Sequence, residues 1–390
     1  MTLQLLTEDQ RTRLDRAAAI KGDLVEFALT PPFQRPFREH LRRCAHRELD
    51  AESQAIEAVE SLLFEHRYDD GGTVLDRFIA RNRKLAEPDI ELLGSWNDSV
   101  HGVFEVLEKQ ADQLLLNNLF DEMPYTVYSS AGAEAVEDVE PGSFLITRVL
   151  PIDAMWMLSG TQALFPVEHR AAMAQVVAQR SLEHPELVLR NPCKRRAALD
   201  AARSMHESFL ECFGTDLLLV GGAQVSATYQ QFVAFHTSRV TPEEDSATIA
   251  GQVVDSAEYD AMFGSVNSVA VSHHPESGIW FFADYDLVSD AFANPDLVRR
   301  QQKHRDAVRG YLRDESIPPW VFDTLRRVSP ENADTVFQSI LGEPAFRWDT
   351  DGAELMRHHK RDYFNRHPLA VGVVPAPSIA VEHYTASQAS

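Results

Sequence analysis

The chain of 390 residues is too long for one ordinary hydrophobic core, so its length predicts two or three domains. A hydrophobic fraction of 44% and an aromatic fraction of 9% are typical of packed globular domains and exclude a wholly disordered chain. The formal net charge is −22, which disfavours non-specific binding of nucleic acid, because that binding depends on Lys and Arg neutralising phosphates.

The negative charge is concentrated in two segments. Between Gly94 and Pro166, eleven acids face two bases, a net of −9. Between Val240 and Val298 there are eleven acids and no Lys or Arg, a net of −11. We expect both segments to repel nucleic acid. The first residues form no secretory signal, no run has the apolar length of a membrane span, and three cysteines without a CxxC pair favour reduced thiols, so we expect a cytoplasmic protein without membrane contact.

Residues 1–92 predict a helical N-terminal domain. Thr7 and Gln10 have the spacing of a capping box for a first helix, which we expect to end at Gly22. The apolar spacing within 37–66 predicts one long helix. Breaks are expected at Pro31, Pro32, Pro36 and the DDGG turn of 69–72, with a further helix in 73–85.

Residues 93–166 predict a small β-barrel. Alternating apolar residues with short breaks indicate about five strands, typical of a barrel of the SH3 or OB kind. Closure of the sheet removes the exposed edges that an open five-stranded sheet would leave. The aromatic residues of this segment are expected in its core, namely Trp96, Phe104, Tyr125, Tyr128 and Phe144.

Residues 167–370 predict a mixed α+β domain that ends in helices, and 371–390 a disordered tail. Helices are expected up to residue 213, followed by a buried strand in 216–222 and then, in 241–264, loop and helix. Residues 267–286 read as a hairpin in which Gly278 takes the left-handed turn position. The whole chain is therefore expected to be α+β.

The end of this hairpin carries the strongest catalytic candidate. The stretch "GIWFFADYDLV" resembles the strand end of haloacid-dehalogenase-like phosphatases, where Asp284 would be the nucleophile and Asp286 the acid or base, with Mg²⁺ at the phosphoryl group. The later acidic pair and the further strands of such a site are not found after Asp286. The favoured interpretation is a strand that runs into a helix, which Asp284 or Asp286 caps.

Histidine and arginine residues supply two further candidates. His273 on the same hairpin is a candidate metal ligand together with Asp284 and Asp286, although adjacent His273 and His274 point to opposite faces of a strand. The alternative interpretation is that His273 is only a packed or solvated side chain. The densest basic cluster includes Arg35, Arg38, Arg42 and Arg43, and residues 35, 38 and 42 fall on one helical stripe. This stripe is either a binding surface for an acidic partner or a solvated helix face.

The order of features from Trp96 to about Lys360 resembles a group of uncharacterised bacterial proteins. The resemblance rests on SWNDSVHGVFEV, PGSFLITRVLPID, GIWFFADYDLVSDAFANPDLV and YLRDESIPPWVFDTL followed by ENADTVF. Members of that group often carry a SEC-C zinc knuckle, whose cysteine cluster this chain lacks. The resemblance implies a shared fold and no activity.

These observations favour a non-enzymatic interaction or regulatory protein that presents acidic surfaces to a partner protein. The alternative is a metal-dependent hydrolase or phosphotransferase that uses Asp284 and Asp286. The third interpretation is binding of a polyanion through the arginine stripe, with affinity that falls steeply with salt. We predict no cofactor under the first interpretation and a divalent metal such as Mg²⁺ under the second.

Overall fold

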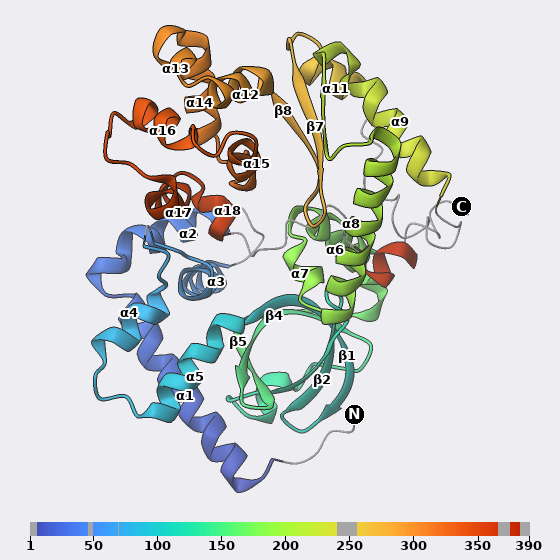
Figure 1. Cartoon of the computed structure of the whole chain (residues 1–390). Coiled ribbons are helices and arrows are strands. Elements are labelled where there is room, and N and C mark those ends of the chain that lie inside the picture. Colours follow the sequence, from blue (N-terminus) through green and yellow to red (C-terminus); the bar gives the residue numbers. More distant parts are fainter. Residues whose placement is uncertain (1–5, 46–49, 69, 240–255, 366–374, 383–390) are drawn as a thin grey trace. The chain divides into compact units, whose positions relative to one another are not determined.

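The computed structural model describes residues 6–45, 50–68, 70–239, 256–365 and 375–382 (Figure 1). The chain forms two compact units, one of Met1–Asn191 with Ala376–Ser390 and the other of Pro192–Pro375. The predicted fold class is confirmed: the chain is α+β, with a closed five-stranded barrel and helical regions before and after it. The finer domain boundaries at residues 92, 166 and 370 stay predictions.

The first unit begins with a layer of helices that packs against β4 and β5 of the barrel. These elements are α1 (Glu8–Ala28), η1 (Pro31–Phe33), α2 (Gln34–Cys44), α3 (Ala51–Phe64), α4 (Val74–Arg81), α5 (Glu87–Ser95) and η2 (Trp96–Asp98). The long helix predicted for 37–66 is therefore wrong. It is two helices, and Asp50 caps the second by accepting hydrogen bonds from the backbone N–H groups of Glu52 and Ser53.

The start of α1 was predictable and its end was not. Thr7 and Gln10 form the predicted capping box, with the Gln10 backbone nitrogen 3.3 Å from Thr7 Oγ1. The predicted end at Gly22 is wrong, because the helix continues to Ala28. Leu24 and Ala28 extend the buried stripe of the helix, and their burial outweighs the low helix propensity of one glycine, a penalty of about 1 kcal/mol.

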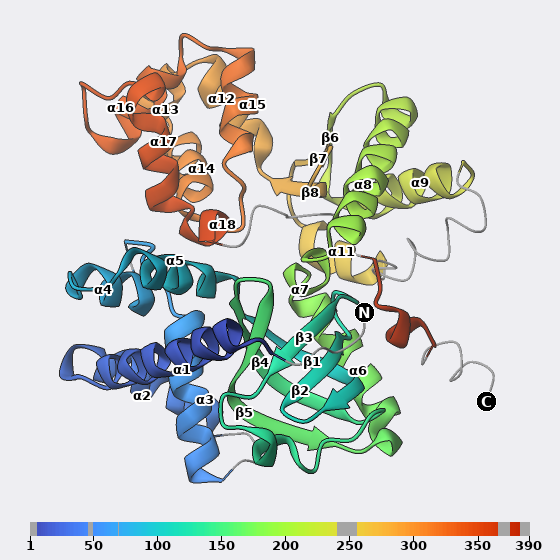
Figure 2. The same ribbon diagram turned by 90° about the horizontal axis from the view of Figure 1, so that it is seen from below.

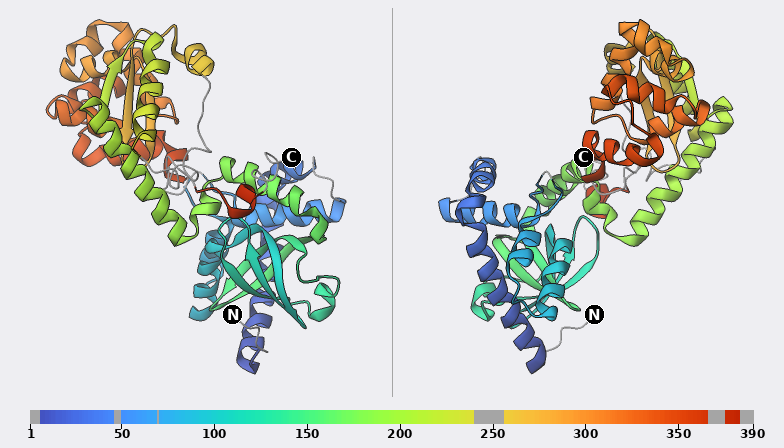
Figure 3. Two further views of the ribbon diagram at one scale, coloured as in Figure 1. Left: turned by 90° about the vertical axis from the view of Figure 1, so that its right-hand side faces the viewer. Right: turned by 60° about the vertical axis from the view of Figure 1, so that its left-hand side comes forward.

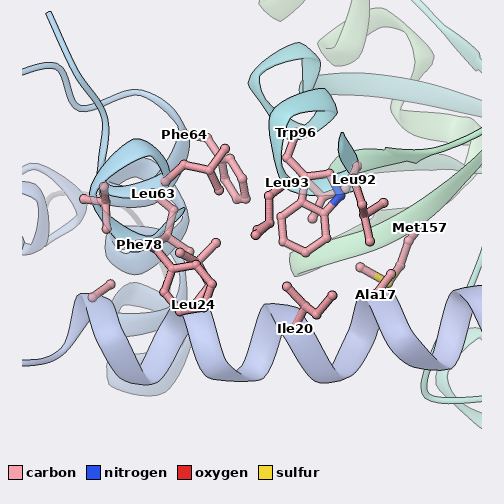
Figure 4. Packing of buried hydrophobic residues seen from close by; sticks show 14 of the residues in the cluster. Ala17, Ile20, Leu24, Leu63, Phe64, Phe78, Leu92, Leu93, Trp96 and Met157 are labelled. Atoms are coloured by element: carbon pink, nitrogen blue, oxygen red, sulfur yellow. The ribbon is translucent and has the colours of Figure 1, made fainter. Parts of the chain in front are cut away.

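The core of this helical layer lies where α1 meets the other helices. Figure 4 shows Ile20 of α1 below Trp96 and Leu93, and Leu24 beside Leu63 and Phe78, while Met157 of the barrel joins the same cluster. Trp96 is fully buried. One continuous apolar cluster therefore joins the helical layer to the barrel.

The barrel consists of β1 (Val100–Gln110), β2 (Gln113–Asn118), β3 (Pro124–Tyr128), β4 (Phe144–Ile152) and β5 (Met155–Phe165). Its strand order is β1-β2-β3-β5-β4, closed by antiparallel pairing of β1 with β4, and the β3–β5 pair is parallel (Figure 2). This order is that of an OB-type barrel. The five aromatic side chains predicted for the barrel core are all buried, but only Phe104 and Tyr125 belong to the cluster inside the barrel. Trp96 and Tyr128 pack with the helical layer, and Phe144 packs with α6.

A buried group of charged side chains also links the helices to the barrel. Lys21 Nζ lies 2.5 Å from Glu60 Oε1, and Ser159 Oγ donates a hydrogen bond of 2.9 Å to the other oxygen of Glu60. Arg148 Nε lies 3.6 Å from Glu60, and the same guanidinium pairs with Glu65. Because each charge meets an opposite charge, the desolvation penalty of burying them is offset.

The second unit contains a three-stranded antiparallel sheet in the order β6-β7-β8. Its strands are β6 (Leu217–Val220), β7 (Val269–His274) and β8 (Gly278–Ala283). The predicted hairpin is confirmed, with Gly278 at a φ of +78°. The strand predicted in 216–222 is present as β6, but its predicted burial is wrong: β6 is an edge strand, and Leu219 is 50% exposed.

Helices cover both faces of this sheet. Val269 and Val271 face one side, where α8 (Pro192–Phe213), α9 (Val225–Thr237) and α11 (Ser256–Phe263) pack. Ala270 faces the other side, toward α12 (Tyr285–Ala293), α13 (Asp296–Arg300), α14 (Gln302–Arg313), α15 (Trp320–Val328), α16 (Ala333–Leu341) and α17 (Trp348–His359); α18 (Arg361–Asn365) follows. Of the segment 241–264, predicted as loop and helix, residues 241–255 lie outside the described residues.

Candidate interaction site on the barrel

A short segment late in the sequence docks on the barrel. The disorder predicted for 371–390 is wrong for Ala376–Glu382, here called the docked segment: residues 378–382 are helical and Ile379 is 6% exposed. Figure 3 shows this short red helix beside α6 (Arg170–Glu183) and the barrel strands. Residues 371–374 and 383–390 lie outside the described part of the chain.

Ile379 is the apolar anchor of the docked segment. It packs against side chains of β1, β4, α6 and the residues that follow β2. The side chains around it are Val103, Leu119, Phe120, Phe144, Met173, Ala174 and Val177. Full burial of an isoleucine contributes roughly 1.5–3 kcal/mol, which is enough to offset the ordering of about two residues. This apolar contact therefore supplies part of the free energy that orders the seven residues of the docked segment.

Polar contacts fix the orientation of the docked segment. The backbone N–H of Ser378 donates to Glu122 Oε1 at 2.5 Å. Arg170 bridges two carboxylates, with 3.2 Å to Glu105 Oε1 and 3.1 Å to Glu382 Oε2. Because Arg170 is 45% and Glu382 65% exposed, this ion pair adds little free energy and serves mainly to select a carboxylate at that position.

The turn between β2 and β3 is built to present Glu122. Glu122 has a φ of +56°, a left-handed conformation that few non-glycine residues adopt. The neighbouring Asp121 is fully buried and accepts hydrogen bonds from Tyr125 Oη at 2.7 Å and from the Met123 backbone N–H at 3.0 Å. Burial raises the pKa of Asp121. These buried contacts hold the turn in its strained form and place Glu122 beside the docked segment.

The apolar side chains around Ile379 together with Glu105, Glu122 and Arg170 are here called the barrel groove. An open pocket of about 260 Å³ adjoins the docked segment, lined on the barrel side by Glu105, Asn117, Leu119, Glu122 and Arg170. The groove offers an apolar recess, an acceptor for a backbone N–H and a cation for a carboxylate. This combination suits the binding of a short peptide segment.

Sequence reasoning missed every residue of the barrel groove. The docked segment is the end of a mostly apolar stretch, PLAVGVVPAPSIAVE at 368–382, in which Ile379 does not stand out. Glu105, Glu122 and Arg170 are ordinary charged residues that lie far apart in sequence from Ser378 and Glu382. Only the fold brings them together.

The aspartates of the hairpin lie in the second unit, at the junction of β8 and α12. Asp284 is the N-cap residue of α12, but it has a left-handed φ of +54° and its side chain makes no capping hydrogen bond, so a capping role for that carboxylate is wrong. Asp286 lies in the first turn of α12 and accepts a hydrogen bond from Ser268 Oγ. β8 pairs antiparallel to β7.

His273 does not approach these aspartates. It pairs with Ile279, whereas Ala283, the residue before Asp284, pairs with Val269 at the far end of β7, roughly 13 Å along the strand. Its ring is buried between aromatic side chains of α8 and α9. Across the described ranges, no three His, Cys, Asp or Glu side chains are placed to hold a metal ion. Metal binding at Asp284 and Asp286 stays a hypothesis.

The arginine stripe lies on α2, on the side opposite the buried His40 and Cys44. Arg35, Arg38, Arg42 and Arg43 are exposed. Arg35 Nε is 3.4 Å from Glu39, and Arg38 donates to Gln34 at 3.2 Å. The arginine stripe therefore faces solvent, and its residues do not belong to the barrel groove.

Comparison with known proteins adds one relationship. Residues 46–184 match the model of a family of unknown function (DUF7986), a range that contains the whole barrel, Glu105, Glu122 and Arg170 but not the docked segment. No curated protein and no solved structure matches the chain. In the described ranges, none of the helices combines the length and the apolar character needed to cross a bilayer.

Proposed function

We propose that this chain is a non-enzymatic interaction protein of the cytoplasm, which binds a short segment of a partner protein in the barrel groove. The observation that supports this function is the docked segment itself: a stretch of chain about 200 residues away from α6 in sequence is seated there by one apolar anchor and two polar contacts. A groove that orders its own chain in this way has the chemistry to hold a similar segment of another protein.

The surface around the barrel fits a protein partner better than nucleic acid. Glu134, Glu137, Asp138 and Glu140 are exposed in the loop between β3 and β4, and they favour a partner with basic residues. Single-stranded nucleic acid stacks its bases on aromatic side chains, whereas the predicted aromatic residues of this barrel are buried. The proposal includes no cofactor.

The relationship to bacterial proteins that carry a SEC-C motif stays a proposal of shared fold. It brings no zinc function, because the three cysteines of the chain form no knuckle. The family match to residues 46–184 is compatible with that fold relationship and assigns no activity.

Peptide binding by the full chain tests the proposed function. The probe is a fluorescent peptide with the sequence of residues 375–382, and the protein carries Ile379→Asp, which removes the anchor of its own docked segment. We expect saturable binding by fluorescence anisotropy, weakened about tenfold by the additional change Arg170→Glu, which places a third carboxylate beside Glu105 and the peptide's acid. Arg299→Glu in the second unit is the matched charge control. Absence of binding in all variants would refute the function.

Polyanion binding through α2 is a second candidate, supported by the exposed arginines on one face of that helix. The test is binding of a single-stranded DNA oligonucleotide at two salt concentrations. Arg38→Glu with Arg42→Glu is expected to abolish binding and its salt dependence, while Arg81→Glu with Arg83→Glu, an equal charge change at exposed positions, leaves them. Equal effects of the two pairs would remove the stripe as a site.

A further inference from the structure

We propose that the barrel groove recognises a helical segment with an apolar residue followed three residues later by an acid, and that the docked segment is an internal competitor for it. This inference rests on the proposed function and adds to it the chemistry of the partner and the regulation of the site. The partner is a protein segment of this pattern, and the docked segment is its example in the same chain.

The i and i+3 pattern follows from the helical geometry of the docked segment. Ile379 and Glu382 are three residues apart, so they lie on the same face of the helix. Ile379 enters the apolar cluster, and Glu382 meets Arg170 at the rim of the same groove. A segment with the acid at i+2 would turn its carboxylate away from Arg170 when the anchor is seated.

Glu122 adds a requirement at the start of the segment. Its carboxylate accepts the N–H of Ser378, the residue directly before the anchor. A proline at that position has no N–H to donate and would leave the Glu122 carboxylate without this hydrogen bond. The groove therefore selects three features: a backbone donor, an apolar anchor directly after it, and an acid three residues after the anchor.

Competition follows because the partner and the docked segment use the same contacts. A tethered segment acts at a high effective concentration, on the order of millimolar for a short flexible linker. A segment whose intrinsic Kd lies below this concentration occupies the groove for most of the time, and the apparent affinity for a partner falls by the free fraction. The wild-type chain is therefore a restrained form of the binding protein.

A peptide series on the full chain tests both parts of the inference. We expect the peptide of residues 375–382 to bind the Ile379→Asp chain about tenfold more tightly than the wild-type chain, and the Glu382→Lys chain to show the same direction of change. Peptides with Ile replaced by Asn or with Pro at the position of Ser378 are expected to bind at least tenfold more weakly. The peptide with the acid moved to i+2 loses only the exposed ion pair, so its affinity is expected to fall by about twofold to fivefold.

A charge exchange separates recognition from general loss of structure. The peptide with Lys in place of its Glu is expected to bind poorly to the Ile379→Asp chain and to regain affinity when that chain also carries Arg170→Glu. Equal peptide affinity of the wild-type and Ile379→Asp chains overturns the competition, and equal affinity of the i+2 and i+3 peptides overturns the pattern. If no peptide binds any chain, the proposed function itself fails.

Discussion

Lys21 of α1 and Glu60 of α3 form an ion pair of 2.5 Å although 39 residues separate them, and both side chains are largely buried. Strand β5 of the barrel packs directly against this pair. Gly160 of β5 has a φ of +72°, and a Cβ added there would lie 2.7 Å from Glu60 Cγ. The ion pair thus fixes the place where the helical layer meets the barrel, within the unit that carries the barrel groove.

Removal of one partner of this pair should destabilise the first unit strongly. Glu60→Gln leaves Lys21 and Arg148 without the carboxylate between them, so we expect a loss of about 3–5 kcal/mol in the free energy of unfolding, measured with urea. Lys21→Met combined with Glu60→Leu should recover part of that loss, because neither charge then remains buried.

The exposed pair Arg35 and Glu39 is the matched control for this measurement. Arg35 is 92% exposed in its side chain, and replacement of either residue by Gln should change the free energy of unfolding by less than about 0.5 kcal/mol. If the buried and the exposed pair cost the same, the cluster around Glu60 does not hold the helices on the barrel.

Lys360 makes the stability of the second unit sensitive to alkaline pH. Its side chain is fully buried, and its Nζ donates to the backbone oxygen of Tyr311 at 2.6 Å and to that of Asp314. Burial lowers the pKa of Lys360 to about 8, although Asp314 and Glu315 act in the opposite direction. The ordinary value of 10.5 applies in the unfolded chain.

Since the unfolded state binds more protons between pH 8 and 10.5, the contribution of Lys360 to stability rises with pH across that window. Lys360→Met should remove this rise and cost roughly 1–3 kcal/mol at neutral pH, because two buried carbonyls lose their donor. Urea unfolding of both chains at pH 7 and 10 measures the difference. If the free energy of unfolding changed equally with pH in the wild-type and Lys360→Met chains, Lys360 would not be the group responsible.

His273 should make the same unit sensitive to acid. It is 1% exposed, and neither of its ring nitrogens has a hydrogen-bond partner among the described residues. Burial, and then the neighbouring His206, lower the pKa of His273 to about 3, below its ordinary value of 6.5. The unfolded state therefore binds more protons between pH 6.5 and 3, and stability falls as the pH is lowered through this window.

His273→Leu should flatten this acid dependence and stabilise the chain at pH 7 by roughly 1–3 kcal/mol, because a buried polar ring without partners is replaced by an apolar side chain of similar size. Thermal unfolding from pH 7 to 4 measures both effects. His274→Leu is the control, because His274 is the adjacent residue and points to the opposite face of β7. Greater acid sensitivity in the His273→Leu chain would contradict the prediction.

The parts of the fold that local sequence determines were predictable. The capping box of Thr7 and Gln10, the Gly278 hairpin and the alternating strands of the barrel each depend on residues that are close in sequence. The end of α1 was not predictable from Gly22, because the decisive factor is burial of Leu24 and Ala28 against residues far along the chain.

The same distinction explains why the candidate site was missed. Ser378, Ile379 and Glu382 carry no motif, and their partners on β1, on α6 and between β2 and β3 are defined only once the barrel has closed. In contrast, the pair Asp284 and Asp286 forms a visible motif, but their spacing does not reveal the left-handed backbone of Asp284 or the hydrogen bond from Ser268 to Asp286. The Asp284 and Asp286 motif is visible in the local sequence, whereas the barrel groove depends on long-range geometry.

Asp284 separates the enzymatic alternative from the interaction protein. Its φ of +54° favours glycine, and its carboxylate makes no capping hydrogen bond, so Asp284→Gly should stabilise the chain by about 0.5–1 kcal/mol and Asp284→Asn should be near neutral. Asp284→Val, with a β-branched side chain in the same conformation, should cost about 1–2 kcal/mol. If Asp284 instead holds a divalent metal, Mg²⁺ added to the wild-type chain should raise its melting temperature, and Asp284→Asn should abolish that increase. We expect no such increase. A magnesium-dependent increase that Asp284→Asn removes would revive the hydrolase interpretation and assign this aspartate to its site.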